Sequence, residues 1–234
     1  MTETNTSGII TAAADIIAGA FNALPKRVCN QHKFSDYADY LRENLPAQAE
    51  LDLQREKPLN PAPLVSVAIA CSGASRAAVR STLEALGKQT YANFEVCVVS
   101  ELAQAGLTDY EGIPKFRLVL FNGTAHEQLK AAEKMLNGAY FLQLLPGDLP
   151  APDALHMLVL QTHANPEAEV VFADEDSVID GIRQNPIFKP DYGRDTLRSF
   201  NSIGRPMLVS KRVHTAVGGF RGSTPAELWA YCID

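Results

Sequence analysis

The sequence has no apolar segment that approaches the roughly 18 residues needed to cross a bilayer. It also has no run of lysine or arginine, and its 234 residues carry a formal net charge of −6. Because nucleic-acid-binding surfaces are typically basic, this charge argues against a nucleic-acid partner. The first residues, M-T-E-T-N-T-S, lack the positive region of a secretory signal peptide. These absences predict a cytoplasmic protein, with a peripheral position at the inner membrane as the second option.

Cysteine is scarce, and its four positions include no C-x-x-C pair. Cys71 and Cys97 fall inside apolar, strand-like runs, which predicts buried thiols rather than disulfides. Reduced cysteines are typical of a reducing compartment, which agrees with a cytoplasmic location.

Several catalytic motifs are missing as well. The chain has no G-x-x-x-x-G-K-[ST] and no G-x-S-x-G, which excludes a P-loop hydrolase and a nucleophile elbow at the motif level. The C-S-G-A-S that follows the first apolar run lacks the glycine spacing of a dinucleotide-binding loop. Four histidines show no metal-ligand spacing: His126, His156, His163 and His214.

What the sequence does contain, from residue 64 onward, is a regular alternation of apolar runs and helical patterns. The continuous apolar runs indicate strands buried on both faces. Alternating strands and helices with short connections predict an α/β fold with a mostly parallel sheet covered by helices. Strands are expected at residues 64–71, 94–99, 116–121, 139–145 and 169–173, and helices at residues 75–89, 127–136 and 153–163.

The residues before this alternation predict a helical extension and a linker. Residues 8–24 place apolar side chains near helical spacing, and Asp15 is their only charge. Such a helix could dock on its own domain, mediate a homo- or hetero-oligomer, or lie at a membrane interface. Residues 35–45 predict a second helix. The expected parts are a helical extension at 1–46, an extended, proline-containing linker at 47–63 and an α/β domain at 64–234.

The stretch at residues 138–153, G-A-Y-F-L-Q-L-L-P-G-D-L-P-A-P-D, is the one around which the chain is organised. Its apolar run breaks at Pro146-Gly147 and leaves one carboxylate, Asp148. Open α/β sheets bind ligands beyond the carboxyl ends of their strands. We therefore expect Asp148 at such an edge, together with Asp174, which follows the next buried run.

Several motifs resemble those of family 2 glycosyltransferases with the GT-A fold. L-G-K-Q-T-Y-A-N-F-E-V-C-V-V resembles their S-x-x-x-Q-T-Y-x-N-W-E segment, and the stretch at 138–153 is similar to G-E-Y-(apolar)-L-D-x-D-D-x-L-x-P. F-A-D-E-D-S-V-I-D-G-I-R-Q-N-P-I-F-K-P-D-Y, followed by L-R-S-F-N-S-I-G, resembles the signature of a subgroup that assembles bacterial surface polysaccharides such as rhamnose-rich O-antigen or capsule. The resemblance covers about residues 63–229 and implies a Rossmann-like GT-A sheet with its helices.

The resemblance implies transfer of a sugar from a nucleotide-diphosphate sugar to a glycan acceptor. The leaving diphosphate is usually neutralised by Mg²⁺ or Mn²⁺ held by carboxylates. Here Leu145 and Gly147 stand where the family has two of three acids, which leaves Asp148 as the metal ligand. The positions that the resemblance assigns to the nucleotide sugar are Ser72, Glu101, Asn122 and Asp148.

The resemblance also implies an acceptor side and a base. Asp174, Glu175 and Asp176 either line the acceptor or metal pocket or stabilise the turn after their strand. A base must deprotonate the acceptor hydroxyl, and Glu227 in A-E-L-W matches its position. Alternatively, Glu227 is a charge favoured at a helix N-terminus. In the family, a further region closes over the acceptor beyond the position of Asp234.

Two functions remain open from the sequence. In the first, which we favour, the chain is a glycosyltransferase with a reduced metal site, in which Lys130 or Arg205 supplies positive charge to the diphosphate. In the second, it is a catalytically inactive glycosyltransferase-like domain that binds a glycan or a partner enzyme, with residues 8–24 as the docking helix.

Overall fold

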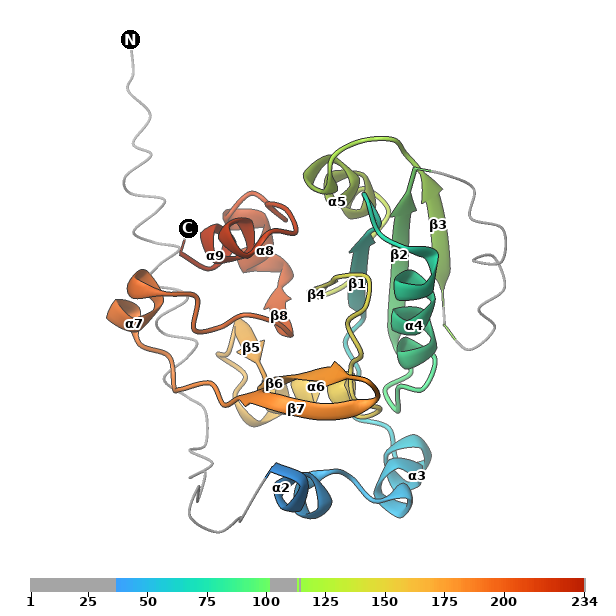
Figure 1. The fold of residues 1–234 in the computed structure, drawn as a ribbon, viewed down its shortest axis with the longest axis vertical. Coiled ribbons are helices and arrows are strands. Elements are labelled where there is room, and N and C mark those ends of the chain that lie inside the picture. The colour runs from blue at the N-terminus through green and yellow to red at the C-terminus, as the bar shows by residue number, and fades with distance from the viewer. Residues whose placement is uncertain (1–36, 102–112, 114, 234) are drawn as a thin grey trace.

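A six-stranded sheet forms the centre of the protein (Figure 1). The computed structural model describes residues 37–101, 113 and 115–233, so the predicted helix at residues 8–24 lies outside the described residues. The strand order is β3-β2-β1-β4-β8-β5. The strands are β1 (Val65–Ala70), β2 (Phe94–Ser100), β3 (Phe116–Leu120), β4 (Tyr140–Leu144), β5 (Val170–Phe172) and β8 (Met207–Ser210).

The first four strands of this order run parallel, and the last two reverse direction in turn. β1 pairs in parallel with β2 and β4, and β2 with β3. β8 is antiparallel to β4, and β5 is antiparallel to β8, so β5 runs in the same direction as β4. The expected α/β fold with a mostly parallel sheet is confirmed, and the five predicted strands form within two residues of their expected ends.

Helices cover both faces of the sheet because its central strands, β1, β2 and β4, are mostly apolar and buried at nearly every position. On one face, α4 (Arg76–Leu86) and α6 (Ala154–Ala164) pack against alternate residues of β1, β2 and β4. On the other face, α5 (Ala125–Glu133) packs against the intervening residues, with Leu129 fully buried. Each such side chain contributes about 1.5–3 kcal/mol when it leaves water. Cys71 and Cys97 are buried free thiols, as expected, and burial raises the pKa of Cys71 to about 12 and that of Cys97 to about 11.

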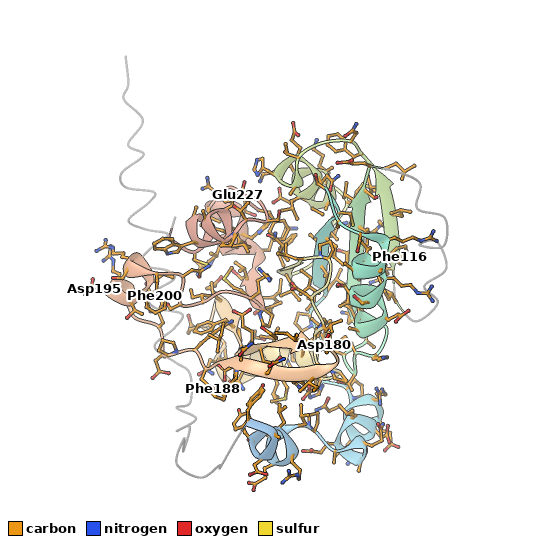
Figure 2. All side chains as sticks on the ribbon, viewed as in Figure 1. Phe116, Asp180, Phe188, Asp195, Phe200 and Glu227 are labelled. Atoms are coloured by element: carbon orange, nitrogen blue, oxygen red, sulfur yellow. The ribbon has the colours of Figure 1, made fainter. Side chains whose placement is uncertain are left out.

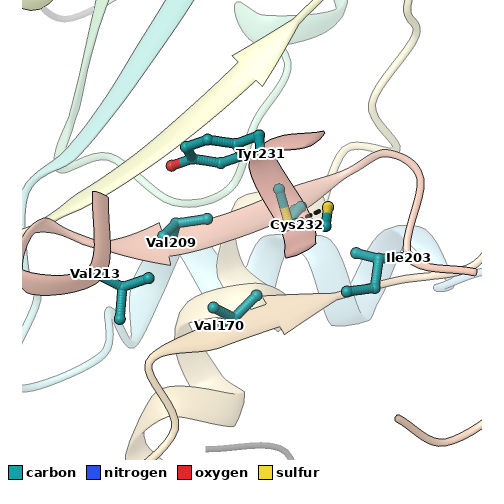
Figure 3. Close-up of a pocket in the computed structure, with 7 residues that line it drawn as sticks. Val170, Ile203, Val209, Val213, Tyr231 and Cys232 are labelled. Carbon is teal, nitrogen blue, oxygen red and sulfur yellow. Dashed lines mark hydrogen bonds between the residues drawn. The ribbon is translucent and has the colours of Figure 1, made fainter. Parts of the chain in front are cut away.

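A second apolar cluster joins β5 and β8 to α7 (Arg194–Ser199), α8 (Lys211–Ala216) and α9 (Pro225–Ile233). Figure 3 shows the small cavity at its centre, which has a volume of about 10 Å³, room for about one water molecule. Its lining is Val170, Ile203, Met207, Val209, Val213, Tyr231 and Cys232. This cluster is the packing that fixes α9 against the sheet.

The residues before the sheet form two helices, α2 (Tyr37–Asn44) and α3 (Gln48–Glu56). α2 agrees with the predicted second helix. The expectation of an extended stretch over 47–63 is wrong for α3, because the prolines that suggested it all follow this helix. Glu50 accepts the backbone N–H of Ala47 at 3.1 Å and so begins the helix, and Leu51 is buried. Whether 1–46, 47–63 and 64–234 behave as separate parts stays a prediction.

A two-stranded hairpin, β6 (Glu175–Ile179) and β7 (Ile182–Ile187), stands apart from the main sheet (Figure 1). Its turn, Asp180-Gly181, has φ angles of 52° and 77°. Positive φ at both central residues is the geometry of a type I′ turn, which Asp-Gly favours. The Tyr37 hydroxyl donates to Asp176 Oδ2 at 2.5 Å, so α2 is attached to the hairpin.

One buried carboxylate fixes the amino ends of the parallel strands. Glu95 in β2 accepts hydrogen bonds from Ser66 Oγ at 2.7 Å, the Asn137 amide at 2.6 Å and Arg117 Nη1 at 2.6 Å. Burial works against its charge, but these hydrogen bonds win and lower the pKa of Glu95. The Gly138 amide donates to the same Ser66 Oγ at 2.7 Å, which sets the start of β4 beside β1.

None of the helices in the described part of the chain has the length and apolar character that a bilayer-spanning helix needs.

The close approach of Gly138 to β1 generates the first prediction. A Cβ atom at position 138 would lie 2.5 Å from Ser66 Oγ and 2.8 Å from the Leu64 carbonyl oxygen. We expect Gly138→Ala to lower the free energy of unfolding in urea by about 1–3 kcal/mol, as overpacking does. Gly87→Ala is the matched control, because its nearest contact is 3.5 Å and its φ is −63°. A Gly138→Ala variant as stable as the control would contradict this account.

Candidate functional site

The four residues that the resemblance assigns to the nucleotide sugar follow the carboxyl ends of four parallel strands. Ser72 follows β1, Glu101 follows β2, Asn122 follows β3 and Asp148 follows β4. We call the loops that contain them the carboxyl edge. Ser72 Oγ donates to Glu101 Oε1 at 3.3 Å, and Asn122 is exposed. Their binding of a nucleotide sugar stays a prediction.

A buried amide from α5, Gln128, holds two of these loops together. Its Oε1 accepts the backbone N–H groups of Cys71 at 2.8 Å and Ser72 at 2.9 Å, and its Nε2 donates to the Phe121 carbonyl at 3.2 Å. Sequence reasoning missed this residue. The signal was a glutamine on the otherwise apolar face of the helix, beside Leu129.

The loop after β4 is closed on itself and attached to α4. Leu145 N donates to Asp148 Oδ2 at 2.8 Å, and Asp148 N donates to the Leu145 carbonyl at 2.9 Å. Gly147 N lies 2.9 Å from Thr82 Oγ1 and 3.0 Å from the Ala78 carbonyl. Gly147 has a φ of +99°, a conformation that side chains rarely adopt. Its backbone therefore disfavours an aspartate at the position where the family pattern has one.

Asp148 is paired with a guanidinium group. Arg205 Nε lies 3.0 Å from Asp148 Oδ2, and Arg205 Nη2 lies 3.3 Å from Asp148 Oδ1. The two side chains are 28% and 24% exposed, respectively. Because β8 is antiparallel to β4, the residues that precede β8 lie beside the residues that follow β4. Arg205 is thereby placed at the carboxyl edge.

The Mg²⁺ or Mn²⁺ that the resemblance implies does not fit this arrangement. These ions bind through several oxygen ligands. The described residues include no group of three or more His, Cys, Asp and Glu side chains that could hold a metal. Asp148, the carboxylate that the resemblance assigns to the metal, already lies 3.0 Å from a positive charge that would repel a cation.

The motif at residues 172–204, which we call the signature, folds into one interlocked cluster next to Arg205. The Lys189 side chain is 2% exposed, and its ammonium donates to the Arg205 carbonyl at 2.6 Å and lies 3.4 Å from Glu175 Oε1. Burial lowers the pKa of Lys189, against the opposing effect of Glu175. Gly204 has a φ of +56°, and a Cβ atom there would lie 2.4 Å from Glu175 Oε1. The D-E-D, F-K-P-D and N-S-I-G parts of the signature therefore meet at one point.

The three acids of D-E-D each have a partner within the chain. Asp174 accepts the Lys189 amide at 2.8 Å, and Glu175 faces the Lys189 ammonium. Asp176 accepts Arg183 Nε at 2.6 Å, besides the Tyr37 hydroxyl. Asp174 lies at the same edge as Asp148, as expected, because β5 runs parallel to β4. These contacts favour a structural role for the acids, and their role as an acceptor pocket stays a prediction.

Glu227 lies in the first turn of α9 (Figure 2), where it closes a capping box. Its Oε2 accepts the Ser223 amide at 3.1 Å, the Thr224 amide at 2.9 Å and Thr224 Oγ1 at 2.7 Å. Hydrogen bonds from the backbone and side chain of Thr224 lower the pKa of Glu227. A carboxylate that is stabilised in its charged form accepts a proton less readily. The geometry supports the helix-terminus alternative, and a role as base stays a prediction.

Of the two cations suggested for the diphosphate, only Arg205 lies at the carboxyl edge beside Asp148. Lys130 lies on α5, where its ammonium is 3.0 Å from Glu133 Oε2 and donates to the Gly218 carbonyl at 2.5 Å. Lys130 thus anchors the segment between α8 and α9 to α5. Of these two cations, Arg205 is therefore the one that could contact a ligand at the carboxyl edge.

Comparisons with known proteins agree with this fold. No family model matches the chain. The chain is 30% identical over 185 residues to the uncharacterized protein y4gI of Sinorhizobium fredii, and 26% identical over 196 residues to the O-antigen biosynthesis protein RfbC of Myxococcus xanthus. These matches cover 74% and 80% of this chain but 20% and 15% of the two proteins. The chain thus spans a fifth or less of the length of these curated relatives.

Among solved structures, the chain is similar to residues 1–349 of Staphylococcus aureus TarS, with a TM-score of 0.55 and 13% identity over 72% of this chain and 54% of that chain. A complex of the same fragment with UDP gives a TM-score of 0.54 at 14% identity, over 71% and 53%. The mannosyltransferase PcManGT of Pyrobaculum calidifontis, in complex with GDP-Man and Mn²⁺, gives 0.50 at 18% identity, over 94% and 61%. The expected GT-A-like fold is confirmed.

The capping box of α9 generates a stability prediction. Thr224→Ala and Glu227→Ala each remove hydrogen bonds of the same box, and we expect Thr224→Ala to lower the free energy of unfolding by about 1 kcal/mol. The double variant should lose less than the sum of the two single losses, because both substitutions break one interaction. Urea denaturation of the four proteins measures this coupling. Additive losses would show that Glu227 does not act through Thr224.

The ion pair at Asp148 generates a metal-binding prediction. We expect Mn²⁺ alone to bind with a dissociation constant weaker than about 1 mM, or about −4 kcal/mol, measured by calorimetry. Leu145→Asp should tighten binding, because it adds a second carboxylate without the backbone strain of a substitution at Gly147. Chelator-sensitive binding of Mn²⁺ in the micromolar range by the unaltered chain would contradict this description of the site.

Proposed function

We propose that this chain is the donor-binding domain of a glycosyltransferase. It would transfer a hexosyl or deoxyhexosyl group from a nucleotide-diphosphate sugar to a glycan acceptor during synthesis of a bacterial surface polysaccharide. The supporting observation is the carboxyl edge of a GT-A-like sheet. The loops that follow four parallel strands there contain Ser72, Glu101, Asn122 and Asp148. The similarity to an O-antigen biosynthesis protein supports the polysaccharide context.

The chemistry of this reaction assigns a task to each part of the site. As the bond between the sugar and the diphosphate breaks, negative charge builds up on the leaving diphosphate, and a fixed positive group stabilises that charge. We assign that positive charge to the Arg205 guanidinium, which donates to Asp148, while the Lys189 ammonium donates to the backbone carbonyl of Arg205. Glu101 would bind the nucleoside, and Asp174, Glu175 and Asp176 would border the acceptor. Glu227 is the base that the resemblance implies, and it would act by releasing Thr224.

A second function is favoured by two specific contacts. Asp148 is neutralised by Arg205, and the Glu227 carboxylate accepts three hydrogen bonds at a helix terminus. A domain with these features could bind a glycan or a partner enzyme without catalysis. In that case residues 8–24 would supply the docking helix of a homo- or hetero-oligomer, at the cytoplasmic face of the inner membrane.

Ligand binding separates the two functions. We expect a uridine, thymidine or guanosine diphosphate sugar to raise the melting temperature, because a ligand at about 100 times its dissociation constant adds about 2.7 kcal/mol of stability. Glu101→Gln should weaken that binding. Glu84→Gln is the matched control. Glu84 lies at the C-terminal end of α4, away from the carboxyl edge, in an exposed pair with Arg80. Stabilisation by a surface glycan, but by none of the nucleotide sugars, would overturn the enzyme and favour the binding domain.

A further inference from the structure

We propose that the carboxyl edge binds the diphosphate of a nucleoside diphosphate directly through Arg205, without a metal ion. The inference rests on the proposed function and specifies how its donor site neutralises the diphosphate. The fold implies a metal held by carboxylates, whereas Leu145 and Gly147 replace two acids and Arg205 occupies the third.

The guanidinium group has donors to spare for a second anion. An arginine carries five N–H donors in a planar fork. Asp148 accepts from the Nε and Nη2 atoms, and no other acceptor among the described residues is bonded to this side chain. At 28% exposure the group is open to solvent in part. Phosphate oxygens match this fork in a two-point geometry, which is why arginine is common wherever phosphate is recognised.

The position of Arg205 is fixed before any ligand arrives. Its carbonyl accepts the buried Lys189 ammonium at 2.6 Å, and the preceding Gly204 amide donates to Asn201 Oδ1 at 3.0 Å. Asp148 then holds the side chain in direction. A preorganised cation loses little free energy in reorganisation when charge develops on the leaving group. Asp148 is in this arrangement a positioning residue for Arg205 instead of a metal ligand.

The two ways of binding diphosphate give opposite responses at Asp148. A metal site loses its ligand in Asp148→Asn, so binding collapses. In a guanidinium site the amide of the Asp148→Asn variant still offers one oxygen acceptor that orients Arg205, and only the competing negative charge is lost, so the diphosphate binds as well as before or better. A chelator should abolish diphosphate binding at a metal site and leave binding at a guanidinium site unchanged.

Calorimetry with nucleoside diphosphates tests whether Arg205 binds the diphosphate without a metal ion. UDP, dTDP and GDP, with UMP, dTMP and GMP as their monophosphate partners, are titrated into the full chain in EDTA and again in Mn²⁺. In EDTA we expect one diphosphate to bind at least about tenfold more tightly than its monophosphate, and Arg205→Gln to remove that preference. Asp148→Asn should keep the preference or increase it, and Arg205→Lys should fall between the unaltered chain and Arg205→Gln.

The chain provides a matched control in a second Arg–Asp pair. Arg183 Nε lies 2.6 Å from Asp176 Oδ2, with a side-chain exposure of 37% against 28% for Arg205. Arg183→Gln therefore removes a comparable ion pair outside the carboxyl edge, and we expect diphosphate binding to be unchanged. If Arg205→Gln fails to fold, as judged by its melting curve, Asp148→Asn in EDTA decides alone: retained binding supports the inference and lost binding overturns it.

The remaining outcomes separate this inference from the proposed function. Diphosphate binding that requires Mn²⁺ and disappears in Asp148→Asn would overturn the guanidinium site and leave the glycosyltransferase in place. Absence of binding by all three nucleoside diphosphates, with and without Mn²⁺, would overturn both.

Discussion

The buried ammonium of Lys189 is the constraint around which the C-terminal third of the chain is arranged. An unpaired charge in the interior costs several kcal/mol, so a cation that is 2% exposed must be surrounded by acceptors. Glu175 and the Arg205 carbonyl supply them, and the approach of Glu175 leaves no space for a side chain at position 204. Fixing the Arg205 carbonyl also fixes where its side chain begins. The buried lysine thus fixes the backbone of Arg205, and the antiparallel entry of β8 brings its side chain beside Asp148.

The same T-x-x-E pattern begins two helices, α5 and α9, and the comparison indicates the role of Glu227. Thr124 and Glu127 form a capping box at α5, in which Glu127 Oε2 accepts the Thr124 amide at 2.8 Å. Thr224 and Glu227 repeat the pattern at α9 with nearly the same distances. At α5 the box begins a helix and the resemblance assigns Glu127 no chemical role. A second use for Glu227 would therefore have to be added to a structural task that already accounts for its contacts.

The elements that could be predicted from the sequence are those set by local pattern. Five strands and three helices of the α/β domain follow from apolar runs and helical spacing, and the carboxyl edge follows from the parallel order of the strands. α3 does not follow from the local pattern, because the prolines within residues 58–63 come directly after it and indicate an extended stretch. The hairpin was missed although Asp180-Gly181 carries the signal of a two-residue turn. The pairing of Arg205 with Asp148, 57 residues apart, depends on β8 entering the sheet in the reverse direction, and no local pattern reports that.

A guanidinium group and a divalent ion can both neutralise a diphosphate, but they need different surroundings to do so. A metal ion carries two charges but must be captured from solution by several oxygen ligands, so it requires the acids that this loop has replaced. A guanidinium carries one charge, is covalently fixed and recognises phosphate through a planar fork. Its interaction with an exposed anion weakens as salt shortens the Debye length to about 8 Å at physiological ionic strength. The absence of Asp at positions 145 and 147 is then coherent with the presence of Arg205, since extra acids beside the guanidinium would compete with the diphosphate for its donors.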